Sequence, residues 1–228
     1  LAKHLRALGM DVLDTKEPGS PHSGICQEIR GTLLRERPEQ FDSLAEMLLF
    51  YADRRQHLMK VTTPALNRGA VVLCDRFNDS TLAYQGARGV SREVMATLRN
   101  LTLGEFQPDL TLFLDPGEEE AHRRMGWRNQ ETPHGETRID NESWEFHKKV
   151  WDNFRAIAAA NPPRIKTIDA RGSIEETQAL VQDAFFQCLL GANAPVLEGY
   201  TLHVPTPEGF FRGETTSNGL TAQWILNA

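Results

Sequence analysis

The chain has 228 residues and a mass of 25.7 kDa, and its 25 Lys and Arg against 31 Asp and Glu give a formal net charge of −6. Hydrophobic residues make up 40% and charged residues 25%, which is the composition of a globular protein and excludes wholesale disorder. The acidic balance argues against a protein that coats nucleic acid, and no apolar run reaches the roughly 18 residues that a membrane span needs.

The N-terminal segment combines a helix, a strand and a turn. Residues 1–9 have the pattern of the second half of an amphipathic helix that ends at a glycine. Residues 10–14 are typical of a strand, and residues 15–19 form a turn that contains Pro and Gly. Because the helical pattern is already under way at Leu1, we expect further elements to precede it in the complete protein.

Two helices are predicted next, at about 24–34 and about 43–59. Apolar side chains recur at helical spacing in the second of them. Ser43 and Glu46 have the spacing of a capping box, which places the start of this helix at Ser43.

The middle of the chain contains two signals for buried strands. Residues 70–74 and 110–115 are apolar runs, which are typical of strands covered on both faces in a parallel sheet. Asp75 directly follows the first run, and helices are predicted at 80–85 and 91–103.

After residue 117 the sequence predicts a helix, a loop, a second helix and a strand. A short helix is expected at 118–125, and residues 126–137 are polar with Gly and Pro, which indicates a mobile loop. Residues 142–160 have a helical pattern, and 164–169 form the last predicted strand.

The C-terminal part divides into a helix and a tail. Ser173 and Glu176 form a capping box for a helix at about 173–190. Residues 191–228 are rich in Gly, Pro and Thr and predict an irregular appendage, either a packed hairpin or a partly disordered tail. The alternation of strands and helices over residues 1–190 predicts an α/β domain with a parallel sheet and helices on both faces.

Charged residues follow the predicted strands at the edge where ligands bind in an open parallel sheet. Asp75 at the end of a strand suits Mg²⁺ in phosphoryl-transfer enzymes, and Arg76 offers the planar fork that matches a phosphate. The alternative is that Asp75 caps a helix while Arg76 forms a surface ion pair.

Phe50, Arg54 and His57 form a second constellation, because their spacing of four and three residues places them on one helix face. A flat ring beside a guanidinium can hold a nucleobase by stacking and hydrogen bonding. The alternative is a core Phe50 beside a solvated Arg54.

Four arginines flank the predicted loop and form a third constellation. Cations on a mobile segment suit a lid that covers phosphates and excludes water. A solvated charged face is the alternative for these residues, which are Arg123, Arg124, Arg128 and Arg138.

Taken in order, six segments resemble the thymidylate kinase family, which phosphorylates dTMP to dTDP with ATP and Mg²⁺. The resemblance extends over about residues 1–190 and implies the three-layer fold of P-loop-type nucleotide kinases. The segments are T-K-E-P-G (15–19), A-E-M-L-L-F-Y-A-D-R (45–54), D-R-F-N-D-S-T-L-A-Y-Q-G (75–86), P-D-L-T-L-F-L-D (108–115), R-I-D-N-E-S-W-E-F-H (138–147) and T-I-D-A (167–170).

The resemblance assigns roles to individual residues. Phe50 would stack on thymine and Arg54 would bond its carbonyl edge, while Arg76 would hold the dTMP phosphate. Asp75 would lie by the reacting phosphates and the metal. The remaining pocket residues would be Glu17, Ser80, Thr81, Tyr84 and Gln85.

The resemblance also bears on the lid and on assembly. Arg123, Arg124, Arg128 and Arg138 become candidates for a lid at about 123–140 that closes on the ATP phosphates, without an indication of which one is catalytic. Family members are homodimers, so a homodimer is expected, with no nucleic-acid or membrane partner. A sparse cysteine content without C-x-x-C spacing is in keeping with a cytoplasmic location.

Three features depart from the family pattern. The family's T-R-E-P-G-G reads T-K-E-P-G-S at 15–20, and its D-R pair after an enlarged lid reads Thr137-Arg138. Its phosphate-binding loop, G-x-x-x-x-G-K-S/T, occurs nowhere in the 228 residues. Because that loop holds the ATP phosphates and Mg²⁺, we expect it to precede Leu1 in the complete protein and residues 1–228 alone to transfer phosphate weakly.

Two other functions stay open at this point. One is a non-catalytic nucleotide-binding or interaction protein that has lost the phosphate loop. The other is a related kinase with another nucleotide substrate, which a preference for dGMP over dTMP would indicate.

Overall fold

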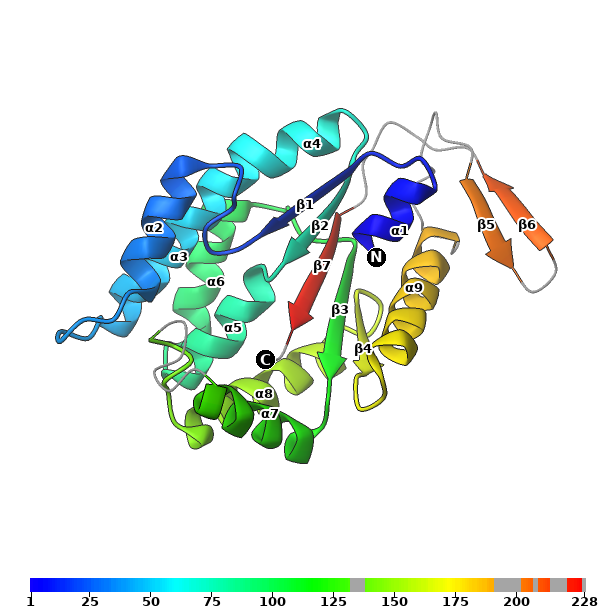
Figure 1. Cartoon of the computed structure of the whole chain (residues 1–228). Coiled ribbons are helices and arrows are strands. Elements are labelled where there is room, and N and C mark those ends of the chain that lie inside the picture. Colours follow the sequence, from blue (N-terminus) through cyan, green and yellow to red (C-terminus); the bar gives the residue numbers. More distant parts are fainter. Residues whose placement is uncertain (132–137, 191–201, 207–208, 214–220, 227–228) are drawn as a thin grey trace.

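A computed structural model covers the whole chain (Figure 1) and describes residues 1–131, 138–190, 202–206, 209–213 and 221–226, with side chains for 1–125 and 138–189. Its centre is a five-stranded sheet in which every pair of neighbouring strands is parallel. The order across the sheet is β1 (Val12–Lys16), β2 (Val71–Asp75), β7 (Thr221–Leu226), β3 (Leu110–Asp115) and β4 (Ile165–Asp169). The predicted α/β fold with a parallel sheet is confirmed.

Helices cover both faces of the sheet, which gives three layers (Figure 1). α1 (Ala2–Ala7) and α9 (Ile174–Leu190) lie on one face. The remaining helices are α2 (Gly24–Leu34), α3 (Ser43–His57), α4 (Thr63–Asn67), α5 (Asn78–Ala87), α6 (Arg92–Leu103), α7 (Glu118–Glu131) and α8 (Trp144–Ala160), and a π-helical turn, η1 (Leu58–Thr62), joins α3 to α4.

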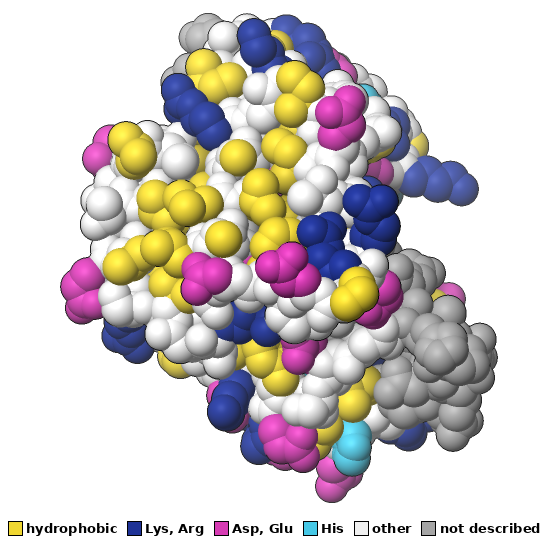
Figure 2. Space-filling view, turned by 90° about the vertical axis from the view of Figure 1, so that its left-hand side faces the viewer, with side chains coloured by type: hydrophobic (Ala, Val, Ile, Leu, Met, Phe, Trp, Pro, Cys, Tyr) yellow, Lys and Arg dark blue, Asp and Glu magenta, His cyan; other side chains and the backbone are white. Residues whose placement is uncertain are grey.

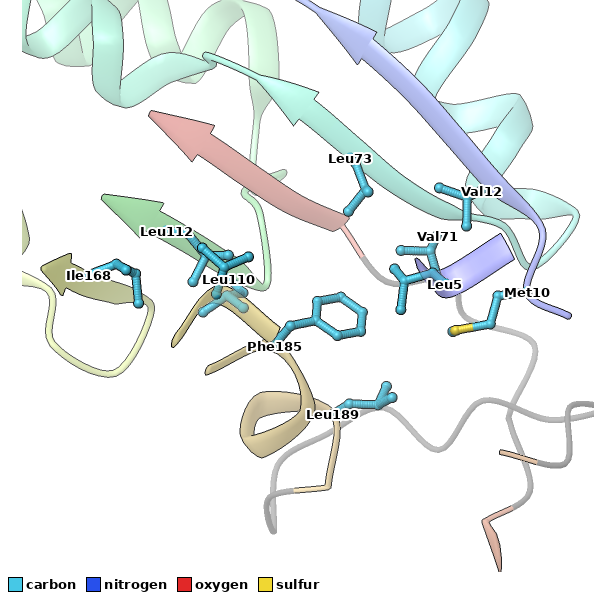
Figure 3. Close-up of a cluster of buried hydrophobic side chains, with 11 residues drawn as sticks. Leu5, Met10, Val12, Val71, Leu73, Leu110, Leu112, Ile168, Phe185 and Leu189 are labelled. Carbon is cyan, nitrogen blue, oxygen red and sulfur yellow. The ribbon is translucent and has the colours of Figure 1, made fainter. Parts of the chain in front are cut away.

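Two apolar clusters fix these layers. On one face, Leu5 of α1 and Phe185 of α9 pack with strand residues such as Leu110 (Figure 3). On the other face, Phe154 of α8 stacks on Phe113 of β3 with ring centroids 5.8 Å apart. Strands that bury both faces explain the continuous apolar runs in the sequence.

The helix boundaries correct one sequence prediction and support another. Ser43 does not cap α3, because Asp42 precedes it and its carboxylate accepts the backbone N–H groups of Leu44 and Ala45 at 3.0 and 3.1 Å. Ser173 and Glu176 do form the expected reciprocal cap, with bonds of 2.8 and 3.1 Å. The capping-box prediction for Ser43 and Glu46 was wrong because Asp42, one residue earlier, is an equally good N-cap.

The predicted loop at 126–137 also needs a correction. α7 extends to Glu131, six residues beyond the predicted helix end at 125. Residues 132–137 lie outside the described part of the chain. No helix among the described residues is long and apolar enough to cross a membrane.

Part of the C-terminal tail lies inside the sheet instead of forming an appendage. β5 (Leu202–Thr206) and β6 (Gly209–Gly213) make a separate antiparallel hairpin. β7, in contrast, runs between β2 and β3 and is parallel to both, with Thr221 opposite Val72 and Ala222 opposite Leu110. The physical reason is that buried strands need backbone partners on both edges, a demand that tail composition did not reveal.

Candidate active site

The carboxyl ends of β1 to β4 meet at one edge of the sheet and bring acidic residues there. Asp115 accepts the Trp151 indole N–H at 3.0 Å, and Asp169 pairs with Arg171 at its own strand end. Asp75 differs, because its Oδ1 is buried and has no hydrogen-bond partner among the described residues. Asp75 therefore has an oxygen available for a ligand.

Glu17 lies at this edge and is the centre of a buried ion-pair network. One carboxylate oxygen accepts Arg54 Nε at 2.7 Å and the other contacts His57 Nδ1 at 2.7 Å. Glu17, Arg54 and His57 are each at most 3% exposed. Because a buried charge is tolerated only when it is paired and hydrogen-bonded, this geometry fixes the Arg54 guanidinium in place.

The same region contains a group of possible metal ligands that the local bonding does not favour. Donor atoms of Glu17, His57 and Cys74 lie within 4.8 Å of one another. Both Glu17 oxygens are already bonded, and burial raises the pKa of the Cys74 thiol well above its usual value. A protonated thiol beside a guanidinium is a poor metal site.

Two side-chain hydrogen bonds, one turn of α5 apart and termed the two rungs, link α3 to α5. Arg54 Nη1 donates to Thr81 Oγ1 at 2.9 Å, and Gln85 Nε2 donates to Glu46 at 3.0 Å. Thr81 and Gln85 are one turn apart on α5, as Glu46, Phe50 and Arg54 are successive turns of α3. The half-buried Phe50 therefore lies between the two rungs.

Arg76 has an unusual backbone at the end of β2. Its φ is +65°, a left-handed conformation that costs a residue other than glycine of order 1 kcal/mol. The guanidinium lies 5.4 Å from the centre of the Tyr84 ring and donates to the Tyr84 hydroxyl at 3.4 Å. The interaction with Tyr84 raises the pKa of Arg76, so the cation is retained. Strain of this kind is typical of functional positions.

A hollow of about 480 Å³ adjoins Asp75. Asp14, Arg124 and Ala170 are among the residues that line it. Burial raises the pKa of Asp75, while Arg76 and Lys16 partly oppose that rise. A hollow whose lining includes carboxylates and a guanidinium suits a phosphate group with a divalent cation.

Comparison with known proteins agrees with this geometry. The thymidylate kinase family profile matches residues 1–181. A thymidylate kinase of Synechococcus sp. is 44% identical over 180 residues, which are 78% of this chain and 82% of that protein, and one of Geobacter sp. is 40% identical over 186 residues, 81% and 82% of the two chains. The crystal structure of the Ehrlichia chaffeensis thymidylate kinase superposes with a TM-score of 0.60 at 28% identity, covering 81% of this chain and 86% of that one.

The chain belongs to the thymidylate kinase family. This result makes it a member of a nucleotide kinase family with the expected α/β fold. The names of these relatives assign no role to any residue of this chain.

The structure brings most of the predicted acceptor residues together. Arg54 contacts Glu17, Thr81 and the carbonyl of Phe77, and Arg76 contacts Tyr84. Ser80 lies at the start of α5, and its buried Oγ has no partner among the described residues. The family segment that reads T-K-E-P-G-S here gains a bond, because Ser20 Oγ lies 2.8 Å from Thr15 Oγ1.

The predicted lid arginines do not gather at one place. Arg124 lines the hollow and donates to the Ala170 carbonyl at 3.2 Å, whereas Arg123 pairs with Glu120 on the outside of α7. Arg138 is buried and binds Glu46 and the carbonyl of Leu33. Arg128 belongs to α7, but its side chain lies outside the described residues.

Sequence reasoning missed two buried acids of α3, Glu46 and Asp53. Glu46 was interpreted as part of a capping box, although it precedes Phe50 by one turn and therefore shares the face of Phe50 and Arg54. Asp53 accepts the backbone N–H of Gly19 at 3.1 Å and is fully buried. For Glu46, an acidic residue on the face of a predicted ligand-binding arginine was the available signal; Asp53, next to Arg54 in sequence, gave none.

Proposed function

We propose that this protein transfers the γ-phosphoryl group of ATP to dTMP, with Mg²⁺, and so produces dTDP. The observation that carries the proposal is the bond from Arg54 of α3 to Thr81 of α5, beside Asp75 and Arg76 at the end of β2. Phe50 precedes Arg54 by one turn of α3. A flat ring, two guanidinium groups and a carboxylate at one edge match a pyrimidine monophosphate and the phosphates with which it reacts.

On the acceptor side, each residue has a distinct task. Phe50 stacks on the thymine ring and Arg54 uses donors beyond its three present bonds to reach a base carbonyl, since a guanidinium has five N–H groups. Arg76 holds the dTMP phosphate, and Tyr84 orients it. Ser80, Gln85 and Glu17 complete the pocket, Glu17 by fixing Arg54.

On the donor side, the chemistry of Asp75 fits a magnesium ion. Its unpartnered carboxylate oxygen is a hard ligand of the kind that Mg²⁺ prefers. The ion, when bound, neutralises charge on the phosphates during transfer. Arg124 lines the same hollow and is the best-placed of the lid candidates to contact ATP, and Arg128 remains a prediction for that role. Arg123 and Arg138 are bonded to Glu120 and Glu46 instead.

The printed sequence contains no G-x-x-x-x-G-K-S/T loop. Since positioning and charge neutralisation supply nearly all the rate of phosphoryl transfer, a chain without this loop should bind dTMP but turn it over slowly. The absence of the loop also supports a second candidate function, nucleotide binding without transfer. A related kinase with another nucleotide substrate is the third.

The proposed enzyme is a cytoplasmic homodimer whose site residues all lie within residues 1–190, while β7 from the tail completes the sheet. Exposed hydrophobic side chains gather on the face formed by α2, α3 and α6 (Figure 2), and include Ile25, Leu44, Leu48, Val94 and Leu101. A contiguous apolar patch of this kind is typical of an interface between subunits. Light scattering should give a mass near twice 25.7 kDa, and a concentration-independent monomer would contradict the homodimer.

The decisive experiment is calorimetric titration of the full chain with dTMP, dUMP and dGMP. We expect dTMP to bind, and Arg76→Ala to weaken it at least about tenfold, because a charge-assisted phosphate bond contributes about 1.5–3 kcal/mol. The unfolding midpoint in urea serves as the control for folding. A preference for dGMP, or unchanged dTMP affinity in a folded Arg76→Ala variant, would overturn the assignment.

A further inference from the structure

Glu46 is a buried carboxylate at the end of the base-binding region, and it has three partners. It is 1% exposed and accepts Gln85 Nε2 at 3.0 Å and Arg88 Nε at 2.9 Å, and it also binds Arg138 Nη2. Two guanidinium groups compensate the burial of its charge, so it can act as a permanent acceptor. The reaction itself has no evident use for this group, because Gln85 stands between it and the pyrimidine.

Gln85 has an amide whose two ends are chemically different. An ionised carboxylate accepts hydrogen bonds and donates none, whereas an amide has an NH₂ donor and an oxygen acceptor. The NH₂ of Gln85 must therefore face Glu46, and Oε1 must face away from it. Gln85 is 2% exposed, so packing from its neighbours restricts other arrangements.

The orientation of the Gln85 amide affects which base can bind, because Gln85 lies at one end of the proposed base site. Gln85 is one turn from Thr81, which Arg54 binds at the other rung, and Phe50 lies between the rungs on the facing helix. A ring stacked on Phe50 therefore has Arg54 toward one end and the Gln85 amide toward the other. With its NH₂ engaged, that amide offers the ring an acceptor.

We propose that Glu46 is a positioning residue that sets base specificity by fixing the amide of Gln85. This inference rests on the proposed dTMP kinase function. The Gln85 oxygen then accepts the N3–H of thymine or uracil, and it opposes the N3 lone pair of cytosine. Discrimination by a buried hydrogen-bonding group is strong because the wrong base leaves that group unpaired.

The test compares the affinities of dTMP and dCMP for the full chain by calorimetry. In Glu46→Gln the new side chain can donate as well as accept, so the Gln85 amide can turn over. We expect the ratio of the dTMP and dCMP affinities to fall about tenfold, the effect of one hydrogen bond of about 1.4 kcal/mol. Because both ligands bind the same preparation, the ratio does not depend on the folded fraction.

Glu142→Gln is the matched control. Glu142 binds the same Arg88 at 2.7 Å, so this variant changes the same kind of group and the same guanidinium partner without touching Gln85. The ratio should keep its unmodified value in Glu142→Gln. An equal fall in both variants would overturn the inference, since the effect would then come from Arg88.

Two further outcomes separate this inference from the proposed function. Firm dTMP binding by the unmodified chain, with an unchanged ratio in Glu46→Gln, would overturn only the role of Glu46. No dTMP binding by the unmodified chain would overturn the proposed function and this inference together. If Glu46→Gln does not fold, Gln85→Met removes the acceptor itself, and a ratio that stays at the unmodified value would overturn the inference.

Discussion

The two sides of the candidate active site differ in how deeply their charges are buried. On the acceptor side, Glu17, Arg54 and Glu46 are at most 3% exposed. Arg54 of α3 binds Glu17 after β1 and Thr81 of α5, and Glu46 of α3 binds Gln85 of α5. On the donor side, the Arg124 side chain is 40% exposed and pairs with Glu120 of its own helix. In the proposed function, charges of the folded core recognise the acceptor, whereas Arg124 contacts the donor from the surface.

This difference predicts how substitutions will behave. A buried charge that loses its partner destabilises the protein strongly, because the remaining charge is left without solvent. A surface ion pair contributes little, because water and salt replace the lost partner. Changes on the acceptor side should thus alter stability and binding together, and changes on the donor side should alter binding alone.

The largest effect is expected from Glu17→Ala. Removing this carboxylate leaves Arg54 buried without its counter-ion and His57 without its partner, so the free energy of unfolding should fall by about 3–5 kcal/mol. Urea denaturation measures that change. Glu120→Ala, which removes the partner of two surface arginines, is the control and should lower the free energy of unfolding far less. Similar losses in the two variants would contradict the comparison.

A smaller effect is expected from the buried carboxyl of Asp53. Burial, with the nearby Glu17 charge, raises the pKa of Asp53 to about 6. Between about pH 4 and pH 6 the folded state keeps a proton on Asp53 that the unfolded state has already lost. The contribution of Asp53 to the free energy of unfolding is therefore fully present at pH 4 and is lost as the pH rises through 6.

Asp53→Asn should remove that dependence. The amide oxygen can still accept the Gly19 N–H, while the side chain no longer ionises. Relative to the variant, the unmodified protein should lose up to about 3 kcal/mol of unfolding free energy between pH 4 and pH 7. Parallel urea profiles of the two proteins across this range would show that Asp53 does not titrate as its burial requires.

The sequence was sufficient for most elements of residues 1–190, although it misplaced the cap of α3 and the end of α7. Apolar runs placed the strands β2 and β3 because a doubly covered strand leaves no polar face. Phe50 and Arg54 were grouped correctly on one face, because helical spacing is a local property. Asp75 was singled out because it follows a strand directly, and the structure gives it the unpartnered oxygen at that edge.

Long-range partners could not be predicted in the same way. Arg54 binds Glu17 from 37 positions away and Arg138 binds Glu46 from 92 positions away, and nothing in either local pattern selects these partners. β7 escaped prediction for a related reason, because a strand of six residues in a polar tail gains its place only from the facing edges of β2 and β3. The partners of buried charges and the neighbours of central strands are determined by the tertiary structure.

The smallest change in stability, and the sharpest test of the comparison, is expected from Arg124→Ala beside Arg123→Ala. Both arginines bind Glu120 at 2.7 Å on the surface of α7, so each variant should change the free energy of unfolding little. Only Arg124 lines the hollow beside Asp75, so only its loss should weaken ATP, by about tenfold in a competition titration against a fluorescent ATP analogue. Unchanged ATP affinity in Arg124→Ala would mean that this arginine does not reach the donor, and an equal loss in both variants would mean that lining the hollow does not decide the contact. A large loss of stability in either variant would mean that the donor side is as deeply buried in the fold as the acceptor side.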